Sequence, residues 1–357
     1  MACWPTSAIG IFPTRAQASA LNRASQIQRR VQLAPYNSFG VPAVAAYFAN
    51  IGSLDELRRA LEFARDKRLS VQILGGGSNV LFVKDYEGLI CHMNIRGISH
   101  LPGPGVVRAS CGENWHGFVS YCMNKSLHGY ENLALIPGSI GAAPIQNIGA
   151  YGVDLAQFLV ELEVLDSERD TVRSFSRAEC EFGYRDSIFK RRAGHRYVVL
   201  SASFELSARN LPNLDYQALK EALPNPGVTP RQIYDTVCRI RRSRLPDPAE
   251  LGNAGSFFKN PVVSRDKYQA LQSEHGEMPS YATEEEGLVK IPAAWLLDRA
   301  GWKGRRRGPA AVHEKHALVL VNSGGANGED ILLLAQEMSS SIQSQFGIGL
   351  VPEVQLI

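Results

Sequence analysis

Two patterns are absent from the sequence: paired cysteines and long apolar runs. The six cysteines are scattered, and none of them forms a C-x-x-C pair or the spacing of a disulfide framework. A reducing compartment fits this distribution best, so we expect a cytoplasmic protein. No run approaches the roughly 18 apolar residues that a membrane-spanning helix requires, and we therefore expect no membrane insertion.

Acidic residues are missing from the first 54 positions, which carry arginine and serine instead. Transit peptides have a composition of this kind. A disordered extension, or translation from an upstream start codon, explains it more simply. We therefore expect residues 1–33 to be a disordered extension.

The charge and the histidines exclude further classes of partner. A formal net charge of +3 is too mild to indicate nucleic-acid binding. No metal site is indicated, because His313 and His316 are the only close histidine pair and no H-E-x-x-H motif is present. The P-loop motif is missing as well.

Hydrophobic periodicity predicts a chain of mixed helices and strands. Ser53 and Glu56 have capping-box spacing ahead of an apolar stripe, so residues 53–69 should form a surface helix. Two segments rich in proline and glycine, 101–105 and 245–248, are interpreted as domain boundaries. Further helices are predicted over 114–126, from Pro230 to Leu245, and along the stripe Ile331, Leu334, Met338 and Ile342; strands are predicted over 71–74, 159–166 and 196–206.

A glycine loop follows the predicted strand 71–74. Val80 stands where a Rossmann fingerprint needs its third glycine, so that fold is not indicated. The exposed N–H groups of such a turn can cradle a phosphate. A plain glycine turn between two strands is the alternative. The loop consists of Gly75, Gly76, Gly77, Ser78 and Asn79.

A second glycine-rich run spans residues 134–152. Its small residues allow a flat, apolar group to come close, and its isoleucines can wall that group in. A buried loop that needs small residues for packing is the alternative. The candidate binding residues in this run are Pro137, Gly138, Ser139, Ile140, Gly141, Ile148 and Gly149.

Ser256 lies in the stretch GNAGSFFKNP, residues 252–261. The small residues before it leave room for a ligand, and the two phenylalanines after it exclude water and hold the backbone in place. The surroundings are not the G-x-S-x-G turn of a hydrolase nucleophile. The hydroxyl is therefore a candidate for chemistry other than nucleophilic attack.

Charged residues mark three more candidate positions. Arg185 lies among aromatic residues in FGYRDSIFK, residues 182–190. The arginines at 239 and 242 end a predicted helix, where cations offset the helix dipole on a solvated face. Arg244 precedes Ser256 by a few residues and suits a pyrophosphate. Glu353 is a single carboxylate among apolar residues and is a candidate functional residue. The alternative interpretation is that it simply points outward from a terminal strand.

Seven motifs together resemble the UDP-N-acetylenolpyruvoylglucosamine reductase family over about residues 34–357. Seven motifs in one order are far more specific than any one of them. The resemblance implies an α+β fold, with a two-part FAD-binding region like that of vanillyl-alcohol oxidase and a third, α/β substrate-binding domain. The motifs are ILGGGSNVLF, ENLALIPGSIGAAPIQNIGAYG, FGYRDSIFK, LPDP, GNAGSFFKNP, AVHEKHALVLVN and PEVQLI.

The resemblance also implies boundaries and chemistry. Residues 34–100 with 348–357 would form the first FAD-binding subdomain, 101–244 the second, and 245–347 the substrate-binding domain. A monomer with non-covalently bound FAD would use NADPH to reduce UDP-N-acetylglucosamine enolpyruvate to UDP-N-acetylmuramate, in peptidoglycan precursor synthesis. The two glycine-rich runs would hold the FAD.

The family's functional residues map onto seven positions. Arg185 and Glu353 would stabilise the charge that develops on the substrate, and Ser256 would donate a proton as a general acid. His316 departs from the amide side chain of a relative, so its contact with the substrate is not implied. Tyr216 marks the form of the family with an extra substrate-covering loop. The implied substrate contacts are Tyr216, Arg244, Asn260 and Tyr281.

Two other classes of function stay open. An FAD-dependent oxidase of the same fold would not need the Ser256 acid and would react fast with oxygen. A binding protein without activity, for a flavin or a nucleotide sugar, would have lost at least one of Arg185, Ser256 and Glu353. All three residues are present.

Overall fold

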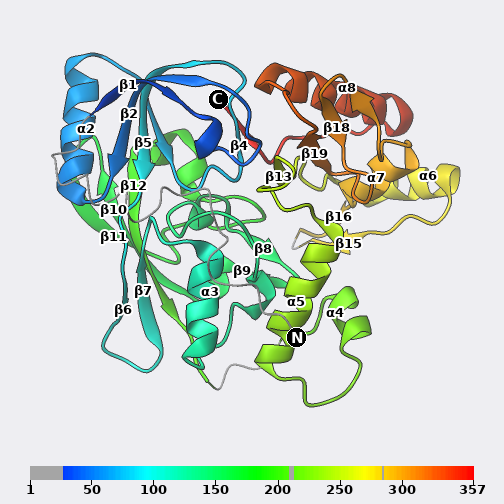
Figure 1. Cartoon of the computed structure of the whole chain (residues 1–357). Helices are drawn as coiled ribbons and strands as arrows, with labels where there is room; N and C mark the ends of the chain where they lie inside the picture. The colour runs from blue at the N-terminus through cyan, green and yellow to red at the C-terminus, as the bar shows by residue number, and fades with distance from the viewer. Residues whose placement is uncertain (1–26, 209–212, 284) are drawn as a thin grey trace. The chain divides into compact units, whose positions relative to one another are not determined.

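The structure is a computed structural model that describes residues 27–208, 213–283 and 285–357. Most of the predicted N-terminal extension therefore lies outside the described residues. The chain divides into two compact units (Figure 1). The first contains Ala45–Gly77 and Glu87–Ser243 with the described residues up to Val31; the second contains Gln32–Val44, Ser78–Tyr86 and Arg244–Ile357.

A four-stranded sheet lies in the first unit, with the order β1-β2-β5-β3. Strands β3 and β5 pair in parallel. The predicted helix α2, Leu54–Asp66, is confirmed: its Ser53 cap accepts from the N–H of Glu56, and the Glu56 carboxylate accepts from the N–H of Gly52. The strands are β1 (Gln28–Gln32), β2 (Val44–Ile51), β3 (Val71–Leu74) and β5 (Tyr86–Met93).

Strand β1 differs from the expectation for residues 1–33. Gln28–Gln32 were assigned to a disordered extension, because the N-terminal segment lacks acidic residues and carries arginine and serine. In the structure they form an edge strand of this sheet. Their side chains are mostly exposed, so the backbone pairing, which composition does not report, places them there.

A five-stranded antiparallel sheet forms the rest of the first unit's framework, with the order β11-β10-β12-β7-β6. Residues 101–105, interpreted as a domain boundary, form the turn between β6 and β7 of this sheet. The three-domain division of the chain stays a prediction. The strands are β6 (Ile98–His100), β7 (Val106–Ser110), β10 (Leu159–Asp166), β11 (Thr171–Ser176) and β12 (Tyr197–Glu205).

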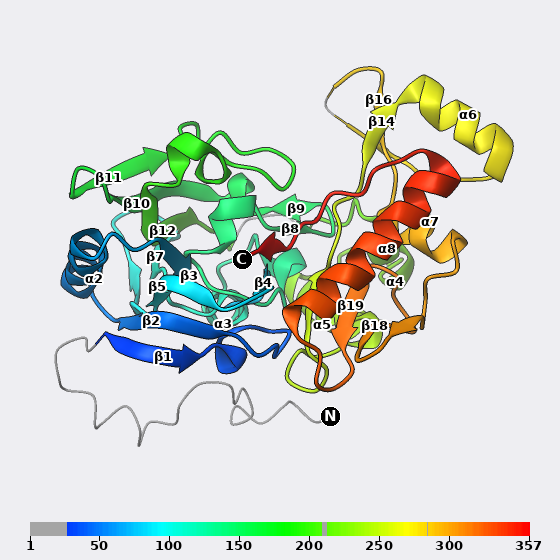
Figure 2. The ribbon, with the colours of Figure 1, turned by 90° about the horizontal axis from the view of Figure 1, so that it is seen from above.

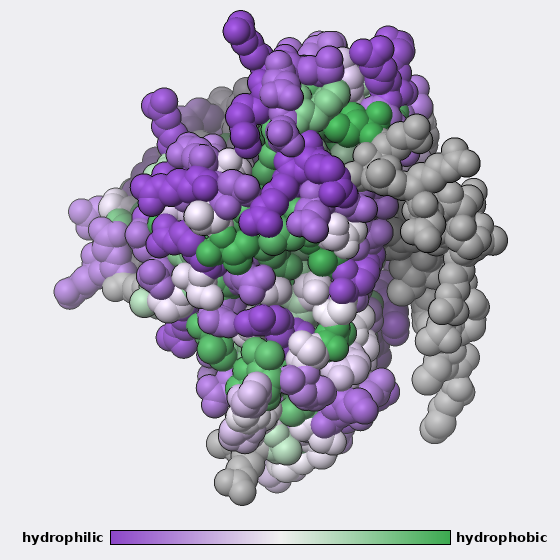
Figure 3. Space-filling view, turned by 90° about the vertical axis from the view of Figure 1, so that its left-hand side faces the viewer, coloured by the Kyte–Doolittle hydropathy of each residue, from purple (hydrophilic) through white to green (hydrophobic). Residues whose placement is uncertain are grey.

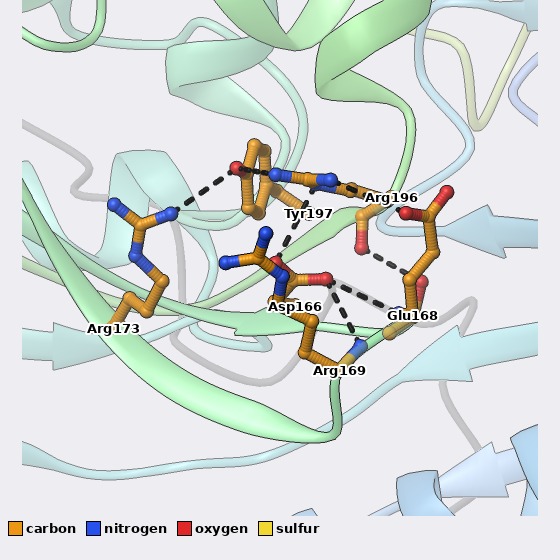
Figure 4. A network of polar contacts seen from close by, with 7 residues as sticks. Asp166, Glu168, Arg169, Arg173, Arg196 and Tyr197 are labelled. Carbon is orange, nitrogen blue, oxygen red and sulfur yellow. Dashed lines mark hydrogen bonds and ion pairs between the residues drawn. The ribbon is translucent and has the colours of Figure 1, made fainter.

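A polar network closes the hairpin between β10 and β11 (Figure 4). The fully buried carboxylate of Asp166 accepts from the backbone N–H groups of Glu168 and Arg169, at 3.2 and 3.3 Å. The Arg196 guanidinium lies 3.5 Å from the same carboxylate and donates to the Tyr197 hydroxyl. The buried charge is thus offset by a nearby guanidinium and two N–H donors.

Three helices complete the first unit. The helix α3, Trp115–Asn124, buries Trp115, Phe118, Val119 and Cys122, as its sequence predicts. The helix α5, Pro230–Arg244, begins with the predicted capping box, in which Thr229 and Gln232 exchange hydrogen bonds. The short helix α4, Gln217–Ala222, precedes it.

The second unit is built on a four-stranded sheet of order β13-β19-β18-β17. The predicted stripe Ile331, Leu334, Met338 and Ile342 is buried in helix α8, Gly328–Phe346, which runs beside β18 and β19 (Figure 2). The strands of this sheet are β13 (Asn253–Ser256), β17 (Arg306–Arg307), β18 (Ala310–Val312) and β19 (Val319–Asn322).

Smaller elements complete the second unit. Strand β20, Gln355–Leu356, pairs in parallel with β4, Val80–Leu81. A three-stranded sheet has the order β14-β16-β15. Its strands are β14 (Val262–Ser264), β15 (Tyr281–Ala282) and β16 (Leu288–Lys290), and the remaining helices are α6 (Arg265–His275) and α7 (Ala293–Arg299).

Hydrophilic side chains cover most of the face in Figure 3, with small groups of hydrophobic residues between them. Val160 on β10 and Val172 on β11 are among the exposed large hydrophobic side chains. None of the helices in the described ranges has both the length and the apolar character needed to cross a membrane.

Candidate active site

The glycines of the first run, which belong to the first unit, meet the second glycine-rich run there. A Cβ atom on Gly75 would lie 2.4 Å from the Ser139 Oγ, and one on Gly76 would lie 3.1 Å from the Gly138 Cα. The first run is a turn between β3 and β4. Gly75 and Gly76 are also required there, because the second run comes so close that a side chain would collide with it.

The start of helix α3 holds the second run in place. The N–H of Trp115 donates to the Gly138 carbonyl at 3.0 Å, and the N–H of Ile140 donates to the Glu113 carbonyl at 2.9 Å. A Cβ on Gly141 would lie 2.6 Å from the Cβ of Cys111. Packing thus accounts for Gly141, as the structural alternative for this run anticipates.

Several polar groups on these two runs have no partner among the described residues. They are the N–H groups of Gly76, Gly77 and Gly138 and the buried hydroxyl of Ser139. A buried hydroxyl without a partner is rare, and here it lies beside N–H groups of glycines that leave no side chain in the way. This arrangement fits the polar edges and phosphates of a flavin nucleotide.

The isoleucines of the second run have a different role from the one expected. Ile140 is fully buried in the core of the first unit, and Ile148 is nearly so. Both belong to one buried cluster with Trp115 and Ala143. Their side chains therefore pack into the protein core. The interleaving of isoleucines with small residues does not tell which side of a loop they face.

Arg185 lies in a tight turn between the paired residues Gly183 and Asp186. Its backbone has a φ of 53°, in the left-handed region that arginine rarely adopts. Its Nη2 donates to the Gly149 carbonyl at 2.6 Å, so the turn aims the guanidinium at the end of the second glycine-rich run. Strained positions of this kind cluster at functional sites.

Arg241 is a second arginine near Arg185 that the sequence reasoning missed. Its Nε donates to the Leu135 carbonyl at 3.3 Å. Burial lowers the pKa of its guanidinium, and the positive charge of Arg185 lowers it further. Tyr151 and Cys238 act in the opposite direction and raise this pKa. No carboxylate in the described part of the chain pairs with Arg241. Two neighbouring guanidinium groups in this setting suit an anionic ligand.

The sequence did contain a signal for Arg241. It lies four residues after Val237 and eight after Ile233, both of which are buried on α5. The helical period therefore places it on the inner side of the helix, whereas Arg239 and Arg242 are exposed.

Ser256 ends strand β13 in the second unit and pairs with Val319 of β19. Asn253 is buried, and its Oδ1 accepts from the N–H of Gly255, which has a φ of 69° at an irregularity in the pairing of β13 with β19. The following Phe257 is fully buried. The irregularity and the buried aromatic thus fix the backbone on both sides of a half-buried serine.

Glu353 lies beside this strand in the same unit. Its N–H donates to the Phe257 carbonyl at 2.8 Å, and Pro352 forms a bridge with Phe258. Its own carbonyl accepts from the Nδ2 of Asn79 at 3.1 Å. Two of the three predicted catalytic residues, Ser256 and Glu353, therefore lie on adjacent segments, and the Asn79 amide is engaged with one of them.

Arg244 is exposed at the end of α5, and its positive charge interacts electrostatically with His316. Burial lowers the pKa of His316, and the charges of His313, Arg244 and Lys303 lower it further. The Nδ1 of His316 accepts from the N–H of Leu318 at 3.3 Å. This part of the second unit concentrates positive charge and is suited to an anion.

The other three predicted substrate contacts are on separate elements. The Oδ1 of Asn260 accepts from the N–H of Ala293 at the start of α7, at 3.0 Å. Tyr281 is exposed on β15, with the Lys290 ammonium 5.9 Å from its ring centre. Tyr216, in the first unit, meets the ring of Tyr151 edge to face at 5.2 Å.

The arrangement within each unit therefore divides the predicted residues. The first unit brings together the two glycine-rich runs, Arg185 and Tyr216, and adds Arg241. The second brings together Ser256 and Glu353, and separately Arg244 and His316.

Comparison with known proteins identifies the family. Residues 45–176 match the model of an FAD binding domain, and residues 247–357 match the C-terminal domain of UDP-N-acetylenolpyruvoylglucosamine reductase. The reductase of Pseudomonas putida is 44% identical over 337 residues, covering 93% of this chain and 99% of the relative. That of Bacteroides fragilis is 44% identical over 335 residues, covering 93% and 100%.

A solved structure is similar to the whole fold. The reductase from Thermus caldophilus superposes with a TM-score of 0.67 at 23% identity, covering 93% of this chain and 99% of that chain. The α+β fold with an FAD-binding region and a separate C-terminal domain, predicted from the motifs, is confirmed. By its sequence, its two matching domain models and its fold, the chain belongs to the UDP-N-acetylenolpyruvoylglucosamine reductase family.

Proposed function

We infer that this chain is an FAD-dependent oxidoreductase that reduces UDP-N-acetylglucosamine enolpyruvate to UDP-N-acetylmuramate for peptidoglycan synthesis. The observation that carries this inference is the 44% identity to reductases of this name over nearly the whole length of both chains. We propose NADPH as the hydride donor.

We propose that the two glycine-rich runs hold the FAD. The support is the set of unpartnered N–H groups on Gly76, Gly77 and Gly138, together with the orphaned hydroxyl of Ser139. When bound, the FAD would supply a hydride to the methylene carbon of the enolpyruvyl group. Every other step falls to side chains of this chain.

Three side chains are proposed to handle the charge and the proton. Addition of hydride to the methylene carbon leaves negative charge on the neighbouring carbon and its carboxylate. The Arg185 guanidinium would stabilise that charge, and Glu353 would assist through a hydrogen bond. The Ser256 hydroxyl would then give its proton to the neighbouring carbon, which completes the addition of two hydrogens across the double bond.

Cationic and aromatic side chains are proposed to bind the nucleotide sugar. Arg244 would contact the diphosphate as a cation, and His316, whose pKa is lowered by burial, would contact it as a neutral hydrogen-bond donor. Asn260, Tyr281 and Tyr216 are proposed as further contacts, with Tyr216 on the extra loop. Arg241 would add a second guanidinium beside Arg185.

We also propose that the protein is a cytoplasmic monomer. The five cysteines that lie in the described ranges are free and buried, which is the usual state in a reducing compartment.

The decisive experiment uses the purified protein. Its visible spectrum should show bound FAD, and adding UDP-N-acetylglucosamine enolpyruvate should oxidise NADPH in proportion to the substrate supplied. A colourless protein that cannot be reconstituted with FAD would refute the inference. Fast NADPH oxidation by oxygen alone, without the nucleotide sugar, would favour an oxidase of the same fold.

A further inference from the structure

The buried amide of Asn132 links two segments that are far apart in the sequence. Asn132 lies in the short helical turn Glu131–Leu133 and is almost fully buried. Its Nδ2 donates to the backbone carbonyl of Tyr151 at 2.7 Å and to that of Asn213 at 3.0 Å. An amide nitrogen carries two hydrogens, so both carbonyls are satisfied by one side chain.

The two carbonyls belong to segments that carry functional candidates. Tyr151 lies at the end of the second glycine-rich run, after its last candidate binding residue, Gly149, and has a left-handed backbone, with a φ of 51°. Asn213 precedes Tyr216 by three residues. Its own Nδ2 donates to the Gly152 carbonyl at 3.4 Å, and its Oδ1 accepts from the N–H of Asp215 at 3.0 Å. Amide side chains therefore tie the two segments together from both sides.

The ring of Tyr216 is positioned by its neighbours in the same unit. It meets the Tyr151 ring at 86°, with ring centres 5.2 Å apart. On its C-terminal side, Leu219 is fully buried, and its N–H donates to the Tyr216 carbonyl at 2.9 Å. On the N-terminal side, Leu214 packs against the core of the unit, and the hydrogen bonds around Asn213 tie the segment to the glycine-rich run.

We propose that Asn132 is the positioning residue for Tyr216, which fixes the direction of the tyrosine toward the nucleotide sugar. This inference rests on the proposed role of Tyr216 as a substrate contact. Without the amide, two carbonyls at a mostly buried site lose their donor. The segment before Tyr216 is then tied to the glycine-rich run by the longer hydrogen bond from Asn213 to Gly152, at 3.4 Å. Tyr216 would then have to be ordered at the moment of binding, which weakens affinity.

The test is a double-mutant cycle between Asn132 and Tyr216. Asn132→Ala should raise the KM for the enolpyruvyl substrate ~10-fold or more, as the loss of hydrogen bonds to buried carbonyls implies. FAD affinity and the rate of flavin reduction by NADPH should stay as in the wild type. In a Tyr216→Ala background, Asn132→Ala should change the KM less than ~2-fold, because the residue it positions is gone.

The matched control is Gln157→Ala. The exposed Gln157 also donates to the Gly152 carbonyl, at 3.5 Å, and none of the hydrogen bonds seen among the described residues joins its side chain to Asn213 or Tyr216. Its KM should equal that of the wild type. If Asn132→Ala does not fold, Asn132→Asp keeps the volume while removing the two donors, and the same cycle applies.

The outcomes separate the two levels of inference. An unchanged KM in Tyr216→Ala would refute the proposed substrate role of Tyr216. A raised KM in Tyr216→Ala, with an equal further rise on adding Asn132→Ala, would refute the positioning role alone. A fall in melting temperature in Asn132→Ala without a change in KM would also overturn it, since the amide would then serve only the fold.

Discussion

The N–H of Glu353 donates a hydrogen bond of 2.8 Å to the carbonyl of Phe257, the residue after Ser256. This bond places the proposed general acid and one proposed charge-stabilising residue on neighbouring segments of one unit, although they are almost a hundred positions apart in the sequence. Because the partner of Glu353 is a backbone carbonyl next to a fully buried ring, substitutions of the Ser256 side chain should leave Glu353 in place.

Ser256→Ala should therefore separate the two halves of the reaction. Reduction of the bound flavin by NADPH needs no acid at this position and should keep its rate. Turnover of the enolpyruvyl substrate should fall ~10³-fold, within the range for loss of a general acid. Stopped-flow absorbance measures both steps, and Ser256→Cys should recover part of the loss. Equal slowing of the two steps would mean that Ser256 supports the fold.

Arg244→Ala should weaken binding of the nucleotide sugar by ~2 kcal/mol, as the loss of a charge-assisted phosphate contact implies. Titration calorimetry with the substrate measures the change. Arg239→Ala is the control, because that arginine is exposed on the same helix and makes none of the contacts proposed here. If the two variants bind the nucleotide sugar with equal affinity, Arg244 does not contact the phosphate and only offsets the helix dipole.

Gly76→Ala should lower the affinity for FAD. The added Cβ would lie 3.1 Å from the Gly138 Cα, and backbone cannot rotate away as a side chain can. The two glycine-rich runs must then move apart. Gly117→Ala in α3 is the control, since its Cβ would meet ordinary contacts of 3.5 Å or more. Quenching of flavin fluorescence gives both dissociation constants, and identical values would contradict the proposed cradle.

The stability of the protein should fall in mild acid because of His116. Burial, together with the charges of Arg242 and Arg241, lowers its pKa to about 4, whereas in the unfolded chain the pKa is 6.5. Between these values only the unfolded chain takes up the proton, so the stabilisation is complete above the unfolded pKa and is lost as the pH falls toward about 4.

When the pH falls from about 8 to about 5, His116 should lower the free energy of unfolding by ~2 kcal/mol. His116→Asn should remove that part of the slope, while keeping an acceptor for the N–H of Leu135, which donates to His116 Nδ1 at 3.0 Å. Urea unfolding at both pH values measures the difference. The exposed His100→Asn is the control, and a slope unchanged by His116→Asn would disprove the assignment.

Local patterns predicted much of this structure, because they report local causes. The cap at Ser53, the capping box at Thr229 and the stripe along α8 act within one or two helical turns, and all three elements form. The motif order then identified the family. The sequence also predicted that Ser256 lies between a residue that uses the conformational freedom of glycine and buried aromatic residues. In the structure Gly255 has a positive φ, and Phe257 is buried.

Contacts between distant segments were beyond the reach of such patterns. Asn132 resembles any polar residue in a loop until Tyr151 and Asn213 come beside it. The orphaned hydroxyl of Ser139 is visible only when the loop that contains Gly75 covers it. Strand β1 escaped prediction for the same reason, because an edge strand is defined by its partner more than by its own composition.

The pairing of β4 with β20 has a consequence for synthesis on the ribosome. Asn79 meets Glu353 across 274 positions, and β4 has no other strand as a neighbour in the described sheets. Translation proceeds at ~5–20 residues per second, so β4 emerges many seconds before the strand that completes it. The first unit can fold meanwhile, whereas β4 stays unpaired until Gln355–Leu356 has emerged, and chaperones would have their longest opportunity to bind there.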